Sequence, residues 1–157
     1  MPTINQVFGS TDKIYTIWLV GKKTSVLADF ALVYDRFGGL LTPIGITSAG
    51  NFTTNQRPQS GASAPTYTWG PTHSVGVPFV ASAKVSAAGA LRVNVSGTIA
   101  TPAGTLSVDG AWDPSLLLIM AGSTGFDFFE CLISNDDVGA ELQDGFVLAL
   151  KQKWGIT

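Results

Sequence analysis

The only histidine of this chain, His73, lies between two hydroxyl residues, Thr72 and Ser74. A histidine can act as the general base for a serine or threonine nucleophile when a carboxylate holds its ring in place. Residues that are adjacent in sequence rarely face each other in that geometry. We therefore interpret these three residues as part of an ordinary loop, and the sequence does not predict a catalytic triad.

Acidic and amide side chains gather in a second segment, SNDDVGAELQDG, at residues 134–145. Carboxylate and carbonyl oxygens are the ligands that Ca²⁺ prefers, but the spacing does not match the pattern of a calcium-binding EF-hand loop. Asp136 and Asp137 are therefore weak metal candidates, and a solvated acidic turn is the favoured interpretation. With a single cysteine and a single histidine in the chain, a structural zinc site is not expected.

Two further carboxylates, Asp127 and Glu130, would suit glycoside hydrolysis only if both faced one cleft. Their odd separation along an expected strand places them on opposite faces, which argues against that role. The sequence contains neither of the glycine-rich patterns that cradle phosphates. Cys131 has no disulfide partner and is expected to be a small buried apolar group. These observations favour a non-enzymatic protein without a cofactor.

The composition is unusually poor in charge. Only 13% of the residues are charged, against about 25% in a typical soluble domain, and the formal net charge is −2. No basic cluster extends beyond Lys22-Lys23, so nucleic acid is not an expected partner. The longest apolar run, residues 116–121, is too short to span a membrane. A surface with so few charges favours burial in a homo-oligomer.

The amino-terminal residues, MPTINQVFGSTDK, carry neither the basic start nor the apolar stretch of a conventional signal peptide. We therefore expect synthesis in the cytosol. Later release, or incorporation into a virion, remains open at this point.

Short segments rich in β-branched and aromatic residues recur along the chain and alternate with glycine and proline turns. They predict strands at residues 14–20, 26–34, 40–46, 79–87, 91–100, 105–112, 116–121, 126–134 and 146–154. Short strands joined by turns indicate an all-β fold, an antiparallel β-sandwich of jelly-roll type, with a closed small β-barrel as the alternative. A chain of 157 residues is expected to form a single domain, residues 1–157.

The first two strands, 14–20 and 26–34, are expected to form a hairpin around a turn at Lys22-Lys23. Both faces of these strands are apolar, which suggests burial on two sides or at a subunit contact. In the next strand, Pro43 favours an edge position, because proline cannot donate to a neighbouring strand.

The last predicted strand, residues 146–154, has a pattern that fits either a strand or a helix. Apolar residues recur both at alternate positions and at helical spacing. Gly139 and Gly145 favour the strand, because glycine weakens helices.

The clearest hairpin, LRVNVSGTIATPAGTLSVDGAW, spans residues 91–112. Its TPAG segment suits a four-residue turn that pairs Ala100 with Thr105. In that register Gly97 and Gly110 both lie on the apolar face, where they bury almost nothing.

These two glycines, with Ala81 and Ala83 of the preceding strand, would line a shallow trough. Either the opposing sheet or a small apolar ligand could fill it. The other face of this sheet is polar and is expected to meet water; it comprises Ser82, Lys84, Ser86, Arg92, Asn94, Ser96, Thr98, Ser107 and Asp109.

Residues 48–78 are rich in Gly, Pro, Ser, Thr and Asn, and predict a long loop or arm. Linkers seldom contain three aromatic residues, so part of this loop is expected to dock on its own domain, on a neighbouring subunit or on a ligand. The candidate ligand or interface residues are Asn51, Phe52, Tyr67, Trp69 and His73.

Three functions follow from these patterns. The leading hypothesis is a non-enzymatic structural protein that self-assembles through sheet faces and the long loop, as a subunit of a virion or another extracellular assembly. The alternative is a carbohydrate-binding, lectin-like module in which Trp69, Tyr67 and Asn51 form a shallow site for a glycan. The third is a small β-barrel that holds an apolar ligand near Gly97 and Gly110.

Overall fold

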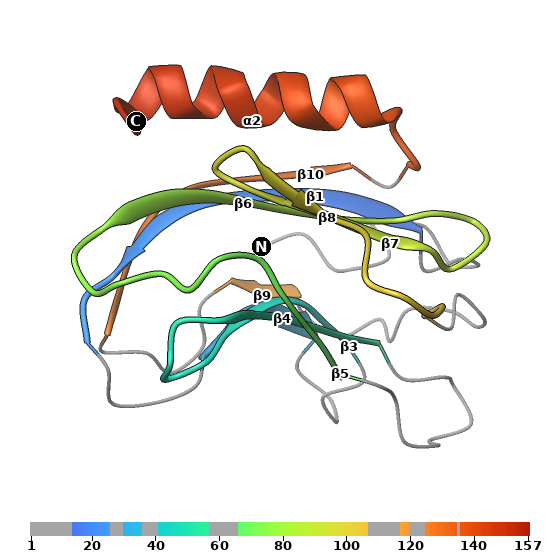
Figure 1. Cartoon of the computed structure of the whole chain (residues 1–157), viewed down its shortest axis with the longest axis horizontal. Coiled ribbons are helices and arrows are strands. Elements are labelled where there is room, and N and C mark those ends of the chain that lie inside the picture. Colours follow the sequence, from blue (N-terminus) through green and yellow to red (C-terminus); the bar gives the residue numbers. More distant parts are fainter. Residues whose placement is uncertain are drawn as a thin grey trace.

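In the part of the chain that the structure describes, two β-sheets pack face to face and a helix lies on the outside (Figure 1). The computed structural model describes residues 14–25, 30–35, 41–56, 66–106, 117–119, 125–134 and 136–157. The elements are β1 (Tyr15–Lys23), β2 (Phe30–Asp35), β3 (Leu41–Ile46), β4 (Phe52–Gln56), β5 (Thr66–Trp69), β6 (Pro78–Val85), β7 (Leu91–Val95), β8 (Thr98–Ala100), β9 (Leu117–Ile119), β10 (Phe126–Ser134) and α2 (Ala140–Trp154).

The first sheet has the strand order β10-β1-β6-β7-β8, and the second has the order β5-β4-β3-β2-β9. All the pairings between described strands are antiparallel. The predicted antiparallel β-sandwich is therefore confirmed. The described strands form two open sheets rather than a closed barrel.

Alternation along the strands builds the core between the two sheets. Ile17, Leu19 and Phe79 point inward from the first sheet and are fully buried. Ile44 and Phe52 meet them from the second sheet and are buried as well. The apolar period of two in the sequence thus corresponds to the inner faces of the sheets.

β1 lies inside the first sheet, between β10 and β6, so the predicted hairpin with β2 is wrong. Lys22 and Lys23 continue the strand instead of forming a turn, and β2 belongs to the second sheet. Trp18 and Val20, on the outer face of β1, are covered by α2. Both apolar faces of this strand are buried within one chain, so they no longer indicate a subunit contact.

β3 lies between β2 and β4, so the predicted edge position of Pro43 is wrong. The pairing around this proline is irregular on both sides of the strand. The register shifts between Ala31 and Val33 on β2, and between Thr42 and Gly45 on β3 itself. Proline is tolerated at such a bulge, where the ladder of backbone hydrogen bonds is already interrupted.

The chain turns after β7 at the dipeptide Ser96-Gly97, and β8 pairs directly across it. Both turn residues have positive φ angles, 50° and 105°, which two-residue hairpins favour because their twist then matches that of the strands. The predicted pairing of Ala100 with Thr105 is therefore wrong. Thr105 forms a bridge with Ala90 instead.

This turn also removes part of the predicted trough. Ala81 and Ala83 are fully buried in the core between the sheets. Gly97 is exposed, and a Cβ atom added there would meet nothing within 4 Å, while Gly110 lies outside the described residues. The structure around Gly97 thus gives no support to an apolar ligand site.

The predicted strand at 146–154 is wrong, because residues 140–154 form the helix α2. Gly155 ends this helix with a left-handed φ of 63°, and Gly145 lies on its exposed side. The helix packs on the first sheet through three buried residues at helical spacing, Gln143, Val147 and Leu150. Such tertiary packing outweighs the low helix propensity of glycine. Among the described residues, no helix is both long and apolar enough to cross a membrane.

The prediction that the polar face of the first sheet meets water is wrong where α2 covers it. Ser82 and Asn94 are only 0% and 2% exposed. Gln143 donates from Nε2 to Ser82 Oγ over 2.6 Å, and Asp144 accepts from both Asn94 and Arg92 over 2.7 Å. The polar residues of these strands are therefore the docking surface for the helix.

The predicted loop at 48–78 contains two strands, β4 and β5, which pair at one edge of the second sheet. Threonine is common in both segments, and this β-branched residue fits a strand as well as a loop. Residues 57–65 of the predicted loop lie outside the described residues.

Candidate functional site

The aromatic residues predicted as ligand contacts are part of the core. Phe52 and Trp69 are 0% and 4% exposed, and their rings stack with centroids 5.2 Å apart. The indole Nε1 of Trp69 donates to Thr54 Oγ1 over 2.9 Å in the same buried layer. Neither ring presents a face to a ligand, and both instead support β4 and β5 from beneath.

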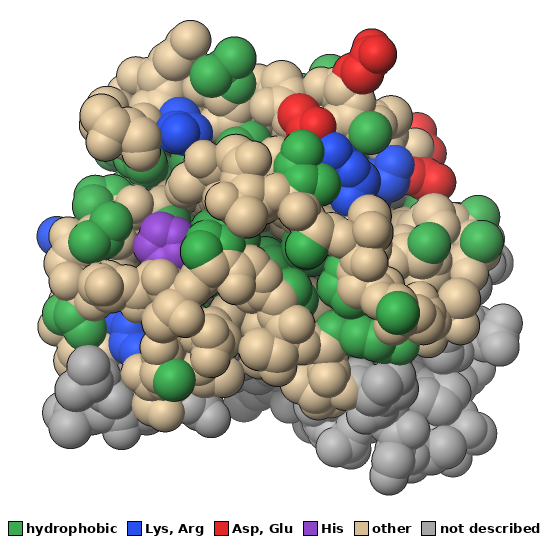
Figure 2. Space-filling view, viewed as in Figure 1, with side chains coloured by type: hydrophobic (Ala, Val, Ile, Leu, Met, Phe, Trp, Pro, Cys, Tyr) green, Lys and Arg blue, Asp and Glu red, His purple; other side chains and the backbone are tan. Residues whose placement is uncertain are grey.

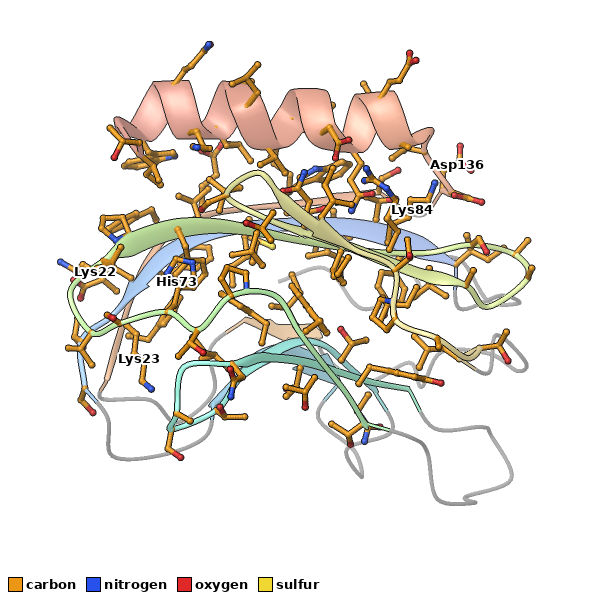
Figure 3. All side chains as sticks on the ribbon, in the orientation of Figure 1. Lys22, Lys23, His73, Lys84 and Asp136 are labelled. Carbon is orange, nitrogen blue, oxygen red and sulfur yellow. The ribbon has the colours of Figure 1, made fainter. Side chains whose placement is uncertain are left out.

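His73 seals one end of the core between the two sheets (Figure 3). Its ring centroid lies 5.5 Å from that of Phe52 and 5.0 Å from that of Phe79. Its backbone N–H donates to the Gly50 carbonyl over 2.9 Å. Burial lowers the pKa of His73 because desolvation disfavours the imidazolium ion. Although part of the residue reaches the surface (Figure 2), the ring is a packing group.

The free energy of unfolding is expected to decrease as the pH falls through the titration range of His73. The unfolded chain takes up a proton near pH 6.5, whereas the folded chain does so at lower pH, so protons favour unfolding in this window. Urea denaturation at pH about 7.5 and about 5.5 measures this loss, which should be smaller in His73→Phe. An identical pH dependence in the variant would contradict the assignment.

Tyr67 and Asn51 lie on opposite sides of the second sheet. The Tyr67 ring packs against the core from β5, and its hydroxyl donates to the Thr105 carbonyl over 3.4 Å. Asn51 immediately precedes β4, and its Oδ1 accepts a hydrogen bond from the Thr72 hydroxyl over 3.0 Å. Of the five predicted site residues, Asn51 is the one that the structure places on the outer face.

The acidic segment before α2 does not assemble a metal site. Asp137 forms an ion pair with Lys84 at 2.7 Å, and Asp136 is exposed. Within the described part of the chain, no group of three His, Cys, Asp or Glu side chains is placed to hold a metal ion.

The two carboxylates of β10 are engaged separately. Asp127 lies 2.9 Å from Lys22, and Glu130 lies 2.8 Å from Lys153. Cys131, on the same strand, packs against the core, and burial raises the pKa of its thiol to about 12. A thiol held in its protonated form is a poor nucleophile.

A row of polar side chains lies on the outer face of β4 and β5. Because Phe52 and Trp69 point inward, their neighbours along each strand point outward. Thr53 lies opposite Thr68, and Asn55 lies opposite Thr66. We call the following six residues the polar strip: Asn51, Thr53, Asn55, Thr66, Thr68 and Thr72.

Hydrogen bonds join the two sides of the polar strip at both ends. Asn55 donates from Nδ2 to Thr66 Oγ1 over 2.9 Å, and Thr72 donates to Asn51 at the other end. The three residues on the β5 side are exposed, and the three on the β4 side are half-buried. Asn55 Oδ1 is buried and accepts no hydrogen bond.

The curvature of the second sheet and a contact from β1 determine where the polar strip lies. Figure 1 shows this sheet bowed, with its convex side toward the first sheet, so the strip lies on the concave side. Lys23 is 1% exposed and donates from Nζ to the carbonyls of Thr47 and Ser48, over 3.0 Å to the first. This contact ties the end of β1 to the turn that precedes Asn51.

Sequence reasoning missed five of the six strip residues: Thr53, Asn55, Thr66, Thr68 and Thr72. The available signal is the alternation of aromatic and polar residues in NFTTN and TYTW. The surrounding Gly, Pro, Ser and Asn residues obscured it, because their density is typical of a loop.

The sequence matches no protein-family model and no curated protein. Solved structures match in fold. A CBM40 domain of the Ruminococcus gnavus IT-sialidase, bound to α2,3-sialyllactose, has a TM-score of 0.62 and 17% sequence identity, over 85% of this chain and 82% of that chain.

Two other structures resemble this chain to a similar degree. The binding domain of botulinum neurotoxin DC, in complex with SialylT, has a TM-score of 0.61 and 8% identity, over 89% of this chain and 36% of that one. A leech intramolecular trans-sialidase has a TM-score of 0.58 and 16% identity, over 92% of this chain and 25% of that one. These likenesses show a shared β-sandwich fold.

Proposed function

We propose that this chain is a carbohydrate-binding module that binds a glycan at the polar strip without catalysis. The observation that carries the proposal is the strip itself: six outward hydroxyl and amide side chains on the concave side of a sheet, bonded across the strands at both ends. The similar Ruminococcus gnavus domain binds sialyllactose on the same fold, which supports a glycan as the ligand.

The chemistry of the strip suits a sugar. Hydroxyl groups donate and accept hydrogen bonds, and amides offer both functions on separate atoms. Threonine and asparagine have short side chains, so ordering them against a ligand costs little rotamer entropy. The aromatic pair Phe52 and Trp69 stiffens the strands from beneath instead of stacking on the sugar.

Two observations favour this function over the others considered. The two-sided burial of β1 is completed by α2 and the second sheet, which removes one reason to expect self-assembly. Among the described carboxylates, Asp127, Glu130, Asp137 and Asp144 all pair with Lys or Arg, which argues against a catalytic role for them.

Loss of the central hydroxyl pair is expected to weaken glycan binding. The double variant Thr53→Val, Thr68→Val keeps the shape of both side chains and removes two hydrogen-bonding groups. Binding to a glycan selected on an array should weaken about tenfold or more by isothermal titration calorimetry, since about 1.4 kcal/mol corresponds to a factor of ten.

The matched control is Thr98→Val, which removes an exposed hydroxyl from β8 of the other sheet. It should leave glycan affinity unchanged. A wild-type chain that binds no glycan on the array would refute the proposed function. Unchanged affinity in the double variant would move the site away from the polar strip.

A further inference from the structure

We propose that the polar strip takes an uncharged stretch of a glycan chain, laid along β4 and β5, and not an acidic sugar. This inference rests on the proposed function and concerns the class of its ligand. It is carried by the shape of the strip, by the engagement of the described basic side chains in other contacts and by the unpaired acceptor of Asn55.

The strip is long and narrow. Asn51, Thr53 and Asn55 follow one another at alternate positions, which spans about 13 Å at about 3.3 Å per residue. The partner residues on the β5 side lie one strand away, at about 4.8 Å. Two cross-strand pairs and the hydrogen-bonded pair Asn51–Thr72 at one end present hydrogen-bonding groups to consecutive units of a chain that runs parallel to the strands.

The basic side chains of the described residues all contact other groups of the protein. Lys22, Lys84, Arg92 and Lys153 form ion pairs with carboxylates, and Lys23 and Lys151 donate to backbone carbonyls. All six of these groups belong to the first sheet or to α2, where acidic and basic side chains gather in Figure 2. The strip itself consists of neutral groups, so it supplies no cation to pair with an acidic sugar.

One atom of Asn55, the side-chain oxygen Oδ1, bears on which ligand group the strip can bind. Its Nδ2 is used by Thr66, which leaves Oδ1 as a buried oxygen that accepts no hydrogen bond. An acceptor of this kind needs a donor, and a sugar hydroxyl is one. An ionised carboxylate group has no proton to donate, so at this position Oδ1 favours a hydroxyl over a carboxylate.

The test is a glycan array that pairs neutral oligosaccharides with the same chains carrying sialic acid, sulfate or uronic acid. The chain should bind neutral members at least as well as their acidic counterparts. Affinity for a neutral member should stay within about twofold between about 50 mM and about 500 mM NaCl, because screening acts on charge pairs.

Two variants test the role of the acceptor. Asn55→Ala removes Oδ1 and should weaken binding of the neutral chain about fivefold to tenfold. Asn55→Asp keeps an acceptor at this place, and Thr66 can donate to it, so binding should stay within about twofold of wild type. Thr98→Val again serves as the control, and circular dichroism checks the fold of each variant.

The outcomes separate the two proposals. Binding that requires the acidic sugar would overturn the inference about ligand class and leave the proposed function standing. Equal losses in Asn55→Ala and Asn55→Asp would overturn the role of the acceptor. An array without any bound glycan would overturn both the inference and the function on which it rests.

Discussion

Asp144→Ala is expected to lower the free energy of unfolding by about 2 kcal/mol, because it breaks the polar contact that docks α2 on the first sheet. Asp144 pairs with Arg92 at 2.7 Å, and the two side chains are 35% and 17% exposed. It also accepts from Asn94, which is 2% exposed. Since water reaches part of the pair, the effect should fall below the about 3–5 kcal/mol typical of fully buried pairs.

Urea denaturation of the purified chain, followed by circular dichroism, measures this difference. Asp136→Ala is the matched control: Asp136 lies in the same acidic segment and is exposed (Figure 3), so its replacement should change stability by less than about 0.5 kcal/mol. Equal effects of the two substitutions would show that the Arg92–Asp144 contact contributes nothing specific to the docking of the helix.

The pH dependence gives this prediction a second readout. Hydrogen bonding from Arg92 holds the pKa of Asp144 below its usual value. Asp144 therefore stabilises the fold above the pKa of about 3.9 of the unfolded chain, and this contribution is lost as the pH falls through the lower folded pKa. Wild type should thus lose more stability in acid than Asp144→Ala does, and the two should converge at low pH.

Gly50→Ala is expected to destabilise the chain by about 3 kcal/mol or more. Gly50 has a φ of +88°, and a Cβ there would lie 2.2 Å from the His73 carbonyl oxygen. Because that oxygen belongs to the backbone, it cannot move aside as a flexible side chain would. The substitution must therefore push the 47–50 turn away from residues 72–73.

Gly76→Ala isolates the steric part of this effect. Gly76 has nearly the same φ, +85°, but a Cβ there would meet nothing within 4 Å. The alanine at this position has only the cost of a left-handed backbone conformation, so the free energy of unfolding should fall by about 1–2 kcal/mol. Chemical denaturation of both variants gives the comparison, and similar losses would rule out the close approach of Gly50 to His73.

Gly50→Ala should also weaken glycan binding at the polar strip. The N–H of His73 donates to the Gly50 carbonyl, and the adjacent residues, Asn51 and Thr72, close one end of the polar strip. Moving the two segments apart separates this pair. The fraction of Gly50→Ala that remains folded is therefore expected to bind glycan more weakly than Gly76→Ala, when both are measured by calorimetry at low temperature.

The candidate site could be predicted from the sequence only in part. Asn51 was a predicted site residue and lies in the polar strip. Phe52 and Trp69 were predicted for their aromatic rings, yet their burial gives them a supporting role. An aromatic residue in a polar segment indicates that the segment docks on something, but the segment alone does not tell whether the partner is a ligand or the core of the same domain.

The sequence by itself determined the class of the fold, because the alternation of apolar and polar residues is a local property of each strand. Ile17, Leu19 and Phe79 are inward in any sandwich built from their strands. The sequence also determined what the chain lacks: with one cysteine it cannot form an internal disulfide.

Only the tertiary structure decided which strands pair, where α2 lies and which polar residues remain outside. The segment 140–154 has a pattern that fits both periods, and it becomes a helix because Ser82, Arg92 and Asn94 offer partners to Gln143 and Asp144. These partners are about fifty or more residues away in sequence. Long-range contacts of this kind leave no mark in local periodicity, and they separate the polar face that docks the helix from the polar strip that we propose as the glycan site.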